Sequence, residues 1–324
     1  MITLKKSPDK DFIIMNISDP QLGNEEWNDD AHNREILVNT FAKIMDKVHP
    51  DLITVSGDLA WSHSYVAYNK LADMIDSYGI PWAPVWGNHD NEAGPENVEI
   101  LVDIMKARKN CIYESGDPTL GNGNYVIAIE ENGKIVEGVI MMDSHDRVEY
   151  INPQGEVDCA WAKVIPEQID WYKDQVKALK DMGCNDTTVI MHIPIYAYRE
   201  AAAAAFPKNT EAKSITIEDS YKESSWNEGY KNSFGVRWEG ICSYPADDGM
   251  MDAILEAGTT KHVVAGHDHT NNFVIEYKGT KLIYSMKIGA GCYWTPKLNG
   301  GTVLTVTSNG VESVHHEYVN DYIK

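Results

Sequence analysis

The sequence lacks the cysteine spacing of a disulfide framework or a zinc knuckle. Its 324 residues include only five cysteines, an odd number, and no two of them are separated by two residues. Disulfide-stapled scaffolds and Cys-x-x-Cys metal sites are therefore disfavoured. We expect reduced and mostly buried thiols, which behave as small apolar side chains in a core.

Basic residues are also scarce. Lysine and arginine number 28 against 49 aspartates and glutamates, which gives a formal net charge of -21. A field of that sign repels polyanions, so nucleic acid is not expected as a substrate. A small phosphate ester remains compatible with this charge, because bound metal ions outweigh the distant surface at short range.

Long apolar runs are absent as well. No stretch is long enough to cross a bilayer, and the first residues, MITLKKSPDKDF, contain no apolar segment after the lysines. We therefore expect no secretory signal, no membrane partner and, by default, a cytoplasmic location. No internal repeat is visible, and no pattern indicates an oligomeric state. We treat residues 1–324 as a single domain with one long insertion.

Short apolar runs rich in β-branched and aromatic residues predict buried strands, and amphipathic segments between them predict helices. Strands that alternate with helices favour βαβ units around a largely parallel sheet. The expected strands are 12–17, 52–56, 82–86, 187–191 and 262–265. The expected helices are 31–48, 64–78, 96–108 and 166–183.

The second half of the chain carries hairpin signals instead. Asn132-Gly133, Lys278-Gly279 and Asn309-Gly310 each lie between two strand-like runs, and such pairs favour tight turns between antiparallel strands. The whole pattern predicts an α/β protein with two mixed sheets packed face to face and helices outside.

Residues 196–250 interrupt this rhythm and form the insertion. Ala201 to Ala205 predict a short piece of helix, and a polar stretch follows. Long loops in compact domains are often functional, so we expect the insertion to lie near the site. Arg237 and Tyr244 in it would contact the substrate or serve ordinary loop packing, and the sequence leaves both open.

The five predicted strands share one property: each leads within a few residues to side chains that bind metals. Because parallel strands end at one edge of a sheet, these side chains are expected to meet there. Gly57, Gly87 and Gly266 each precede one of them, where a chain that turns sharply needs freedom from a Cβ atom. The strand ends lead to Asp19 and Gln21, Asp58, Asn88 with His89 and Asp90, His192, and His267 with His269.

The ordered motifs D-x-Q, GD, GNHD, a lone His and GHDH resemble those of the calcineurin-like metallophosphoesterases, in the branch related to purple acid phosphatases. The resemblance extends from Asp19 to His269. It implies a four-layer α/β/β/α sandwich that hydrolyses phosphate monoesters or diesters at a dinuclear metal centre, with a metal-bound hydroxide as the nucleophile.

The same resemblance implies a role for each residue. Asp58 would bridge the two ions, and a carboxylate suits that position because its charge lowers their mutual repulsion. His89 would face the substrate as general acid or phosphate binder, with Asp90 orienting it. The first ion would be bound by Asp19, His269 and Gln21, and the second by Asn88, His192 and His267.

Oxygen and imidazole ligands without thiolate suit two divalent Mn, Fe, Co or Zn ions. The sequence departs from the family pattern at two positions. Gln21 stands where many members have histidine, so the first ion is expected to bind less tightly. Trp61 stands where purple enzymes have a tyrosine ligand, and an indole has no lone pair to offer.

Other histidines carry weaker signals. We interpret His63 as a surface residue, His145 with Asp143 as a neighbour of the ligands, and His315-His316 as a solvated strand end. Three hypotheses remain open: a metal-dependent phosphoesterase acting on a small ester, a metal-binding regulatory module without useful turnover, and a nuclease or protein phosphatase. The intact His89 favours the first, and the acidic composition disfavours a nuclease.

Overall fold

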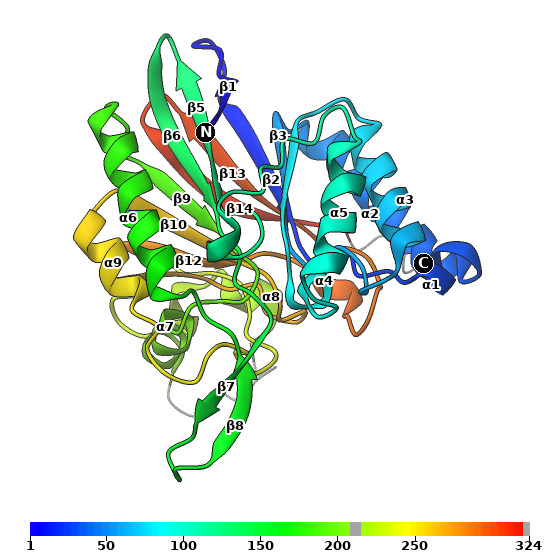
Figure 1. The fold of residues 1–324 in the computed structure, drawn as a ribbon. Helices are drawn as coiled ribbons and strands as arrows, with labels where there is room; N and C mark the ends of the chain where they lie inside the picture. The colour runs from blue at the N-terminus through cyan, green and yellow to red at the C-terminus, as the bar shows by residue number, and fades with distance from the viewer. Residues whose placement is uncertain (208–214, 320–324) are drawn as a thin grey trace.

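The computed structural model describes residues 1–207 and 215–319. Two large β-sheets pack face to face, and helices cover the outer face of each, as Figure 1 shows. This arrangement is the four-layer α/β/β/α sandwich with two mixed sheets that the sequence predicts.

The five-stranded sheet contains the three parallel strands of the N-terminal third. Its order is β14 (Gly310–Tyr318), β13 (Gly300–Thr307), β2 (Phe12–Ile17), β3 (Leu52–Ser56) and β4 (Trp82–Val85). Its outer face is covered by α2 (Ala31–Val48), α3 (Tyr65–Asp76) and α5 (Pro95–Lys106).

The seven-stranded sheet has a parallel centre of β6, β9, β10 and β12. Its order is β1 (Ile2–Lys5), β5 (Tyr125–Glu131), β6 (Lys134–Met141), β9 (Thr187–Ile190), β10 (Thr260–Ala265), β12 (Thr280–Tyr284) and β11 (Val274–Tyr277). Its outer face is covered by α6 (Pro166–Asp181), α7 (Ala197–Ala205) and α9 (Met250–Ala257).

Short helical segments complete the chain. They are α1 (Asn24–Asn28), α4 (Asn88–Asn91), α8 (Ile217–Ser220), and the 3-10 turns η1 (Pro118–Leu120), η2 (Glu223–Ser225) and η3 (Pro296–Leu298). Among the described residues, no helix combines the length and hydrophobicity needed to span a bilayer.

Local chemistry explains why the predicted elements form where they do. The side chain of Asp30 accepts hydrogen bonds from the backbone N–H groups of His32 and Asn33 and so caps α2 at its start. The helix ends at His49, whose backbone is left-handed with φ of 48°. At two of the three predicted hairpins, the turns at Asn132-Gly133 and Lys278-Gly279 place both residues at positive φ, as a tight hairpin turn requires.

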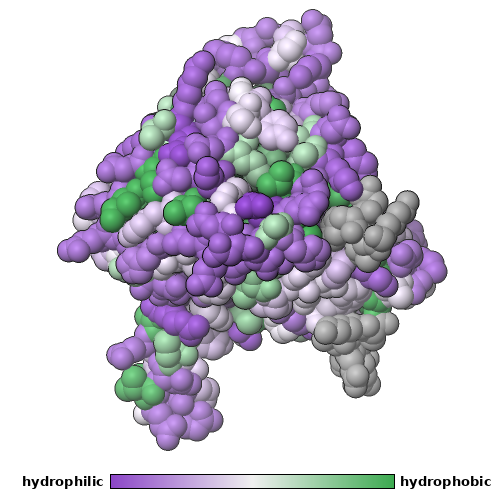
Figure 2. Space-filling model, turned by 90° about the vertical axis from the view of Figure 1, so that its right-hand side faces the viewer, coloured by the Kyte–Doolittle hydropathy of each residue, from purple (hydrophilic) through white to green (hydrophobic). Residues whose placement is uncertain are grey.

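All three predicted hairpins are confirmed, and the structure adds a fourth that was not predicted. β7 (Arg147–Ile151) pairs with β8 (Val157–Trp161) in a separate two-stranded sheet. This hairpin, here called the arm, projects away from the sandwich in Figures 1 and 2. Its outer part carries the exposed apolar side chains of Ile151 and Val157.

The expectation of mostly buried thiols is wrong. All five cysteines lie in the described residues and are unpaired, but only Cys184 is buried, whereas Cys159 and Cys292 are exposed. Cys159 lies on β8 of the arm, which has no core beneath it to bury a side chain.

Candidate metal centre

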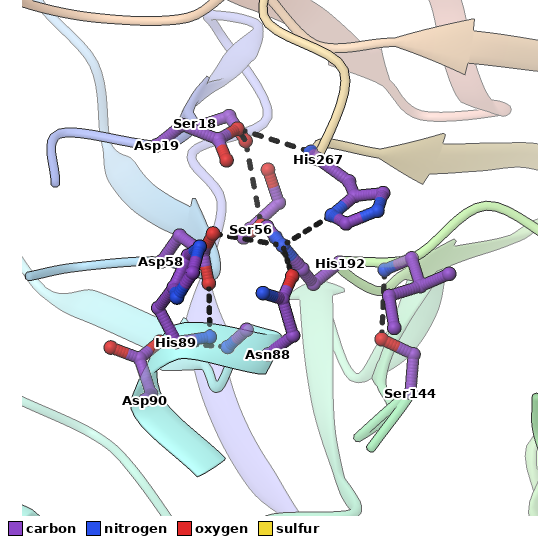
Figure 3. A network of polar contacts seen from close by, with 12 residues as sticks. Ser18, Asp19, Ser56, Asp58, Asn88, His89, Asp90, Ser144, His192 and His267 are labelled. Atoms are coloured by element: carbon purple, nitrogen blue, oxygen red, sulfur yellow. Dashed lines mark hydrogen bonds and ion pairs between the residues drawn. The ribbon is translucent and has the colours of Figure 1, made fainter. Parts of the chain in front are cut away.

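The carboxyl ends of β2, β3, β4, β9 and β10 meet at one edge of the sandwich, and the candidate ligands gather there. Figure 3 shows Asp19, Asp58, Asn88, His192 and His267 arranged around one space. Ligand atoms of Asp58, His192 and His267 lie within 4.8 Å of one another. Asp19 Oδ1 lies 3.4 Å from Nε2 of His269, which brings the last histidine into the same group.

Several of these residues are held in a backbone conformation that side chains rarely adopt. Asp19, Gln21, Asp58 and His267 have φ of 54°, 48°, 50° and 78°. Positive φ is uncommon outside glycine and persists only where the surroundings impose it, often at functional sites. The turns that follow the strands therefore adopt a strained backbone conformation that directs these side chains.

The glycines before the ligands act mainly through close packing. A Cβ atom on Gly57 would lie 2.6 Å from Nδ1 of His192, and one on Gly87 would lie 2.1 Å from Oδ1 of Asp58. Only Gly57 of this pair has positive φ. Both glycines are therefore needed because ligands from other strands cross directly above them.

The hydrogen bonds of His192 fix which of its ring nitrogens carries the proton. Nδ1 lies 2.8 Å from the carbonyl oxygen of Ser56, to which it must donate. Nε2 lies 3.0 Å from Oδ1 of Asn88, 3.2 Å from Nδ1 of His267 and 3.4 Å from Oδ2 of Asp58. It therefore holds either a second proton, which the ring's pKa favours because Asp58 raises it to about 10 despite burial, or a metal ion. A lone pair facing two acceptor oxygens is stabilised by a cation placed between them.

His269 repeats this arrangement on the other side of the centre. Its Nδ1 donates to the carbonyl oxygen of Tyr293 over 2.6 Å, and the two rings stack with centroids 4.1 Å apart. The remaining nitrogen, Nε2, faces the carboxylate of Asp19. Backbone carbonyls that fix the ring orientation in this way are typical of metal-binding histidines.

Three buried ligand atoms have no hydrogen-bond partner. They are Asp19 Oδ1, Gln21 Oε1 and His267 Nε2, and none of these side chains is more than 8% exposed. Leaving a buried polar atom unpaired costs about 1–3 kcal/mol. Unpaired oxygen and imidazole atoms at one buried place fit a transition metal, because they are the donors that such ions bind.

The electrostatics of the site also favour a bound cation. Burial acts to raise the pKa of Asp19, but positive charge on the side of His269 and His192, whether a proton or an ion at their Nε2 atoms, holds it well below its usual range. The pKa of Asp58 is lowered despite burial, mainly by His192. Burial and then the charge of His192 lower the pKa of His267 to about 3, which keeps that ring neutral and able to bind a metal.

His89 lies beside this group and makes a contact that the sequence did not predict. Its Nδ1 lies 2.8 Å from Oε2 of Glu92, one helical turn further along. The hydroxyl of Ser62 lies 2.5 Å from the backbone carbonyl oxygen of His89 and 3.1 Å from the other oxygen of Glu92. The ring of His89 also packs against Trp61, with centroids 4.3 Å apart. The spacing of three residues on a helix is the sequence signal that would have pointed to Glu92.

The expectation that Asp90 orients His89 is therefore corrected. Asp90 is fully buried, and its carboxylate accepts hydrogen bonds from the backbone N–H groups of Leu59 and Gly87 and from the hydroxyl of Tyr68. The start of the short helix turns this side chain inward, where it ties the end of β3 to the end of β4. Asp90 supports the loops of the site and does not contact His89.

We expect Asp90→Asn to reduce the free energy of unfolding by about 2 kcal/mol, because the amide NH2 group would face a donor that the carboxylate now accepts. Urea denaturation followed by circular dichroism measures this loss. Asp46→Asn, on the exposed face of α2, is the matched control and should change stability by less than about 0.5 kcal/mol. Equal stability of the two variants would remove the proposed structural role of Asp90.

The loop that carries His267 and His269 is bound by the insertion, as expected from its predicted position. The side chain of Asn271 accepts from the backbone N–H of Trp238 over 3.0 Å, and that of Asn272 accepts from Val236 over 2.8 Å. Asp268 accepts from the backbone N–H of Cys242 over 3.0 Å. The polar residues around the two histidines thus anchor the insertion to the edge of the centre.

Arg237 and Tyr244, whose roles the sequence leaves open, make different contacts. The guanidinium of Arg237 lies over the ring of Phe206, with its central carbon 5.2 Å from the ring centroid. Tyr244 contacts Tyr150 of the arm, with ring centroids 6.0 Å apart, and the amino group of Lys163 lies over its ring.

The other histidines are now placed. His63 is exposed and lies 3.1 Å from the hydroxyl of Tyr65. His145 contacts Gln168, and its neighbour Asp143 accepts from Asn91 of α4, so this pair supports the helix that begins with Asn88.

The expectation that His315 and His316 form a solvated strand end is wrong for His316. His315 is exposed, but His316 is buried, because successive side chains of a strand point to opposite faces. Its Nε2 donates to the carbonyl oxygen of Asn272. His316 therefore supports the same loop that the insertion binds.

The amide oxygen of Gln21 is buried and has no hydrogen-bond partner, which suits a metal ligand. We expect Gln21→His to tighten the first metal about tenfold, or about 1.4 kcal/mol, because imidazole is the better donor for late first-row ions. Competition titration of zinc against a chelator measures the change. Unchanged affinity would indicate that residue 21 does not bind the metal.

The chain is similar to a known family and to several known proteins. The model of the calcineurin-like phosphoesterases matches residues 12–271. The chain is 29% identical over 261 residues to the probable inactive purple acid phosphatase 14 of Arabidopsis thaliana, covering 73% of this chain and 58% of the relative. It is 22% identical over 321 residues to the phosphatase DCR2 of Saccharomyces cerevisiae, covering 92% and 51%. The chain thus spans between about half and two thirds of the length of these relatives.

A solved structure agrees with the fold. A dimetal phosphatase from Danio rerio superimposes with a TM-score of 0.54 at 11% sequence identity, covering 95% of this chain and 99% of that one. At this identity the likeness concerns the architecture of the chain.

Proposed function

The chain belongs to the calcineurin-like phosphoesterase family, as its motifs predict, and on that premise we propose that it hydrolyses small phosphate esters at a centre of two divalent transition metal ions. The observation that carries the proposal is the convergence of unpaired, buried donor atoms at the shared strand ends. His89, Asp19 and Asp58 are the residues to which the proposal assigns turnover.

The residues present fit two ions. Asp19, Gln21 and His269 would hold the first, and Asp58 would lie between both. Asn88, His192 and His267 would hold the second. When bound, a pair of divalent ions clamps the attacking and leaving oxygens of a phosphate ester and lowers the pKa of the attacking water. The ligand types admit Mn, Fe, Co or Zn.

The chain's own contribution to the chemistry centres on His89. Because Nδ1 is held by Glu92, Nε2 on the opposite edge of the ring is available to give a proton to the leaving oxygen. Ser62 contacts Glu92, and Trp61 limits the rotation of the ring. The carbonyls of Ser56 and Tyr293 keep the lone pairs of His192 and His269 directed at the centre.

A metal-binding module without useful turnover is the alternative, and the names of the Arabidopsis relatives are in line with it. The retention of His89 with its Glu92 partner favours catalysis. A screen of phosphomonoesters, phosphodiesters and nucleotides against protein loaded with Mn, Fe, Co or Zn tests the choice. We expect turnover with at least one metal that is lost in His89→Ala. Absence of turnover under every metal, with both ions bound, would favour the binding module.

We expect close to two equivalents of transition metal per chain after expression in metal-replete medium. The reason is that the ligand types for two ions are complete at the strand ends. Elemental analysis by mass spectrometry measures the content, and dialysis against a chelator provides the baseline. A protein that stays folded but binds no Mn, Fe or Zn would contradict the dinuclear assignment.

A further inference from the structure

The base of the arm lies directly against the metal centre. Trp161, the last residue of β8, meets the ring of His267 edge to face, with centroids 4.4 Å apart and an interplanar angle of 83°. The arm then leaves the body of the molecule, as the course of β7 and β8 in Figure 1 shows. Any group bound at the centre next to His267 has Trp161 as a neighbour, and Arg147 stacks on that indole.

The partner of Trp161 across the arm is Arg147, the first residue of β7. Its guanidinium carbon lies 4.0 Å from the centroid of the Trp161 ring. Such a cation–π contact stabilises the guanidinium and restricts its movement. The stacked face is occupied by the indole, but the N–H donors lie in the guanidinium plane and point away from it.

The guanidinium of Arg147 is accessible to a ligand. It is exposed, and within residues 1–207 and 215–319 its contact with Trp161 is not accompanied by an ion pair. The pKa of the preceding residue, Asp146, is raised by burial, and Arg147 acts against this rise.

We propose that Arg147, held by Trp161, binds unesterified oxygens of the substrate phosphoryl group and selects phosphate monoesters over diesters. The proposal rests on the proposed function of the centre. A guanidinium donates charge-assisted hydrogen bonds to phosphate oxygen through parallel N–H groups. A monoester has three unesterified oxygens and a charge near −2 at pH 7, whereas a diester has two such oxygens and a single charge. When two are engaged at the centre, only the monoester has a further oxygen for Arg147.

The test compares Arg147→Ala and Arg147→Lys with the parent, and Lys177→Ala serves as the control. Lys177 is an exposed cation on α6 whose ion pair with Asp181 is remote from the centre, so this change alters the net charge equally. Each metal-loaded protein is assayed with 4-nitrophenyl phosphate and with bis(4-nitrophenyl) phosphate. Binding of inorganic phosphate is measured separately by isothermal titration calorimetry.

For Arg147→Ala we expect kcat/KM for the monoester to fall about 10- to 100-fold, the usual effect of losing charge-assisted hydrogen bonds. The diester should change less than about threefold, and the Kd for inorganic phosphate should rise in parallel with the monoester loss. Arg147→Lys should recover part of the loss, since it keeps the charge without the planar pair of donors. Trp161→Ala should lower monoester activity as well, and adding it to Arg147→Ala should cost little more.

Equal losses for both esters, or unchanged binding of inorganic phosphate, would overturn the role of Arg147. If the parent protein hydrolyses neither ester, the proposed function fails. The calorimetric comparison of parent and Arg147→Ala still decides whether Arg147 binds phosphate.

Discussion

Asp58→Asn should abolish activity and reduce the metal content below two equivalents per chain. Asp58 is 2% exposed, and its two oxygens face different partners: Oδ1 accepts from the backbone N–H of His89, and Oδ2 faces Nε2 of His192. The amide has the same shape but no charge. Two unit charges about 4 Å apart repel by about 4 kcal/mol at an effective dielectric near 20, and divalent ions repel more strongly.

The expected signature is therefore a joint loss of turnover and metal, with little change in fold. Elemental analysis and a 4-nitrophenyl phosphate assay on the same preparation measure both. Asp76→Asn is the matched control, because Asp76 accepts hydrogen bonds from Trp82 and Asn110 at the opposite end of β4. It should keep its metals and its activity. Full activity with two ions in Asp58→Asn would remove the bridging role.

His89→Ala should lower kcat by about 10²- to 10⁴-fold, the range for loss of a general acid, and leave the metal content intact. Its ring contacts Glu92 and Trp61 and does not belong to the group of unpaired ligand atoms. The loss should be smaller for nitrophenol esters than for alkyl esters, because nitrophenolate leaves without a proton. A series of esters with graded leaving groups measures this dependence.

Glu92→Gln provides the graded comparison. The amide can still accept a hydrogen bond from Nδ1 of His89, but it lacks the negative charge of the carboxylate. The reduction in kcat should therefore be smaller than in His89→Ala and should depend on the leaving group in the same way. Asn39→Ala, a change at an exposed position of α2, should leave the series unchanged. If His89→Ala loses metal, then His89 is a ligand and the division of roles proposed for the GNHD segment is wrong.

The sandwich was predictable because its strands are short apolar runs with clear ends. The five runs coincide with β2, β3, β4, β9 and β10 to within two residues at each end, and the helix expected at 31–48 is α2 with the same bounds. Burial imposes that pattern directly on the sequence. Because the strand ends then meet at one edge, the clustering of the candidate residues could also be predicted.

The arm and the details of the site could not be predicted in this way. Residues of β7 and β8 are mostly exposed and have no core beneath them, so burial imposes no sequence pattern on the arm. Asp90 and Glu92 are both acidic residues of one short segment, and only the turn of α4 decides which of them reaches His89. The burial of His316 depends on a loop more than forty positions away in the chain.

The ligand set is divided between the two sheets by chemical type. The oxygen donors of Asp19, Asp58 and Asn88 follow strands of the five-stranded sheet, and the imidazoles of His192 and His267 follow strands of the seven-stranded sheet. On the proposed assignment, an ion held by both types would cross-link the two halves of the sandwich, much as a staple does. Metal binding and the packing of the two sheets would then be thermodynamically coupled. Chelation of the metal would weaken the packing between the sheets, and separation of the sheets would release the metal.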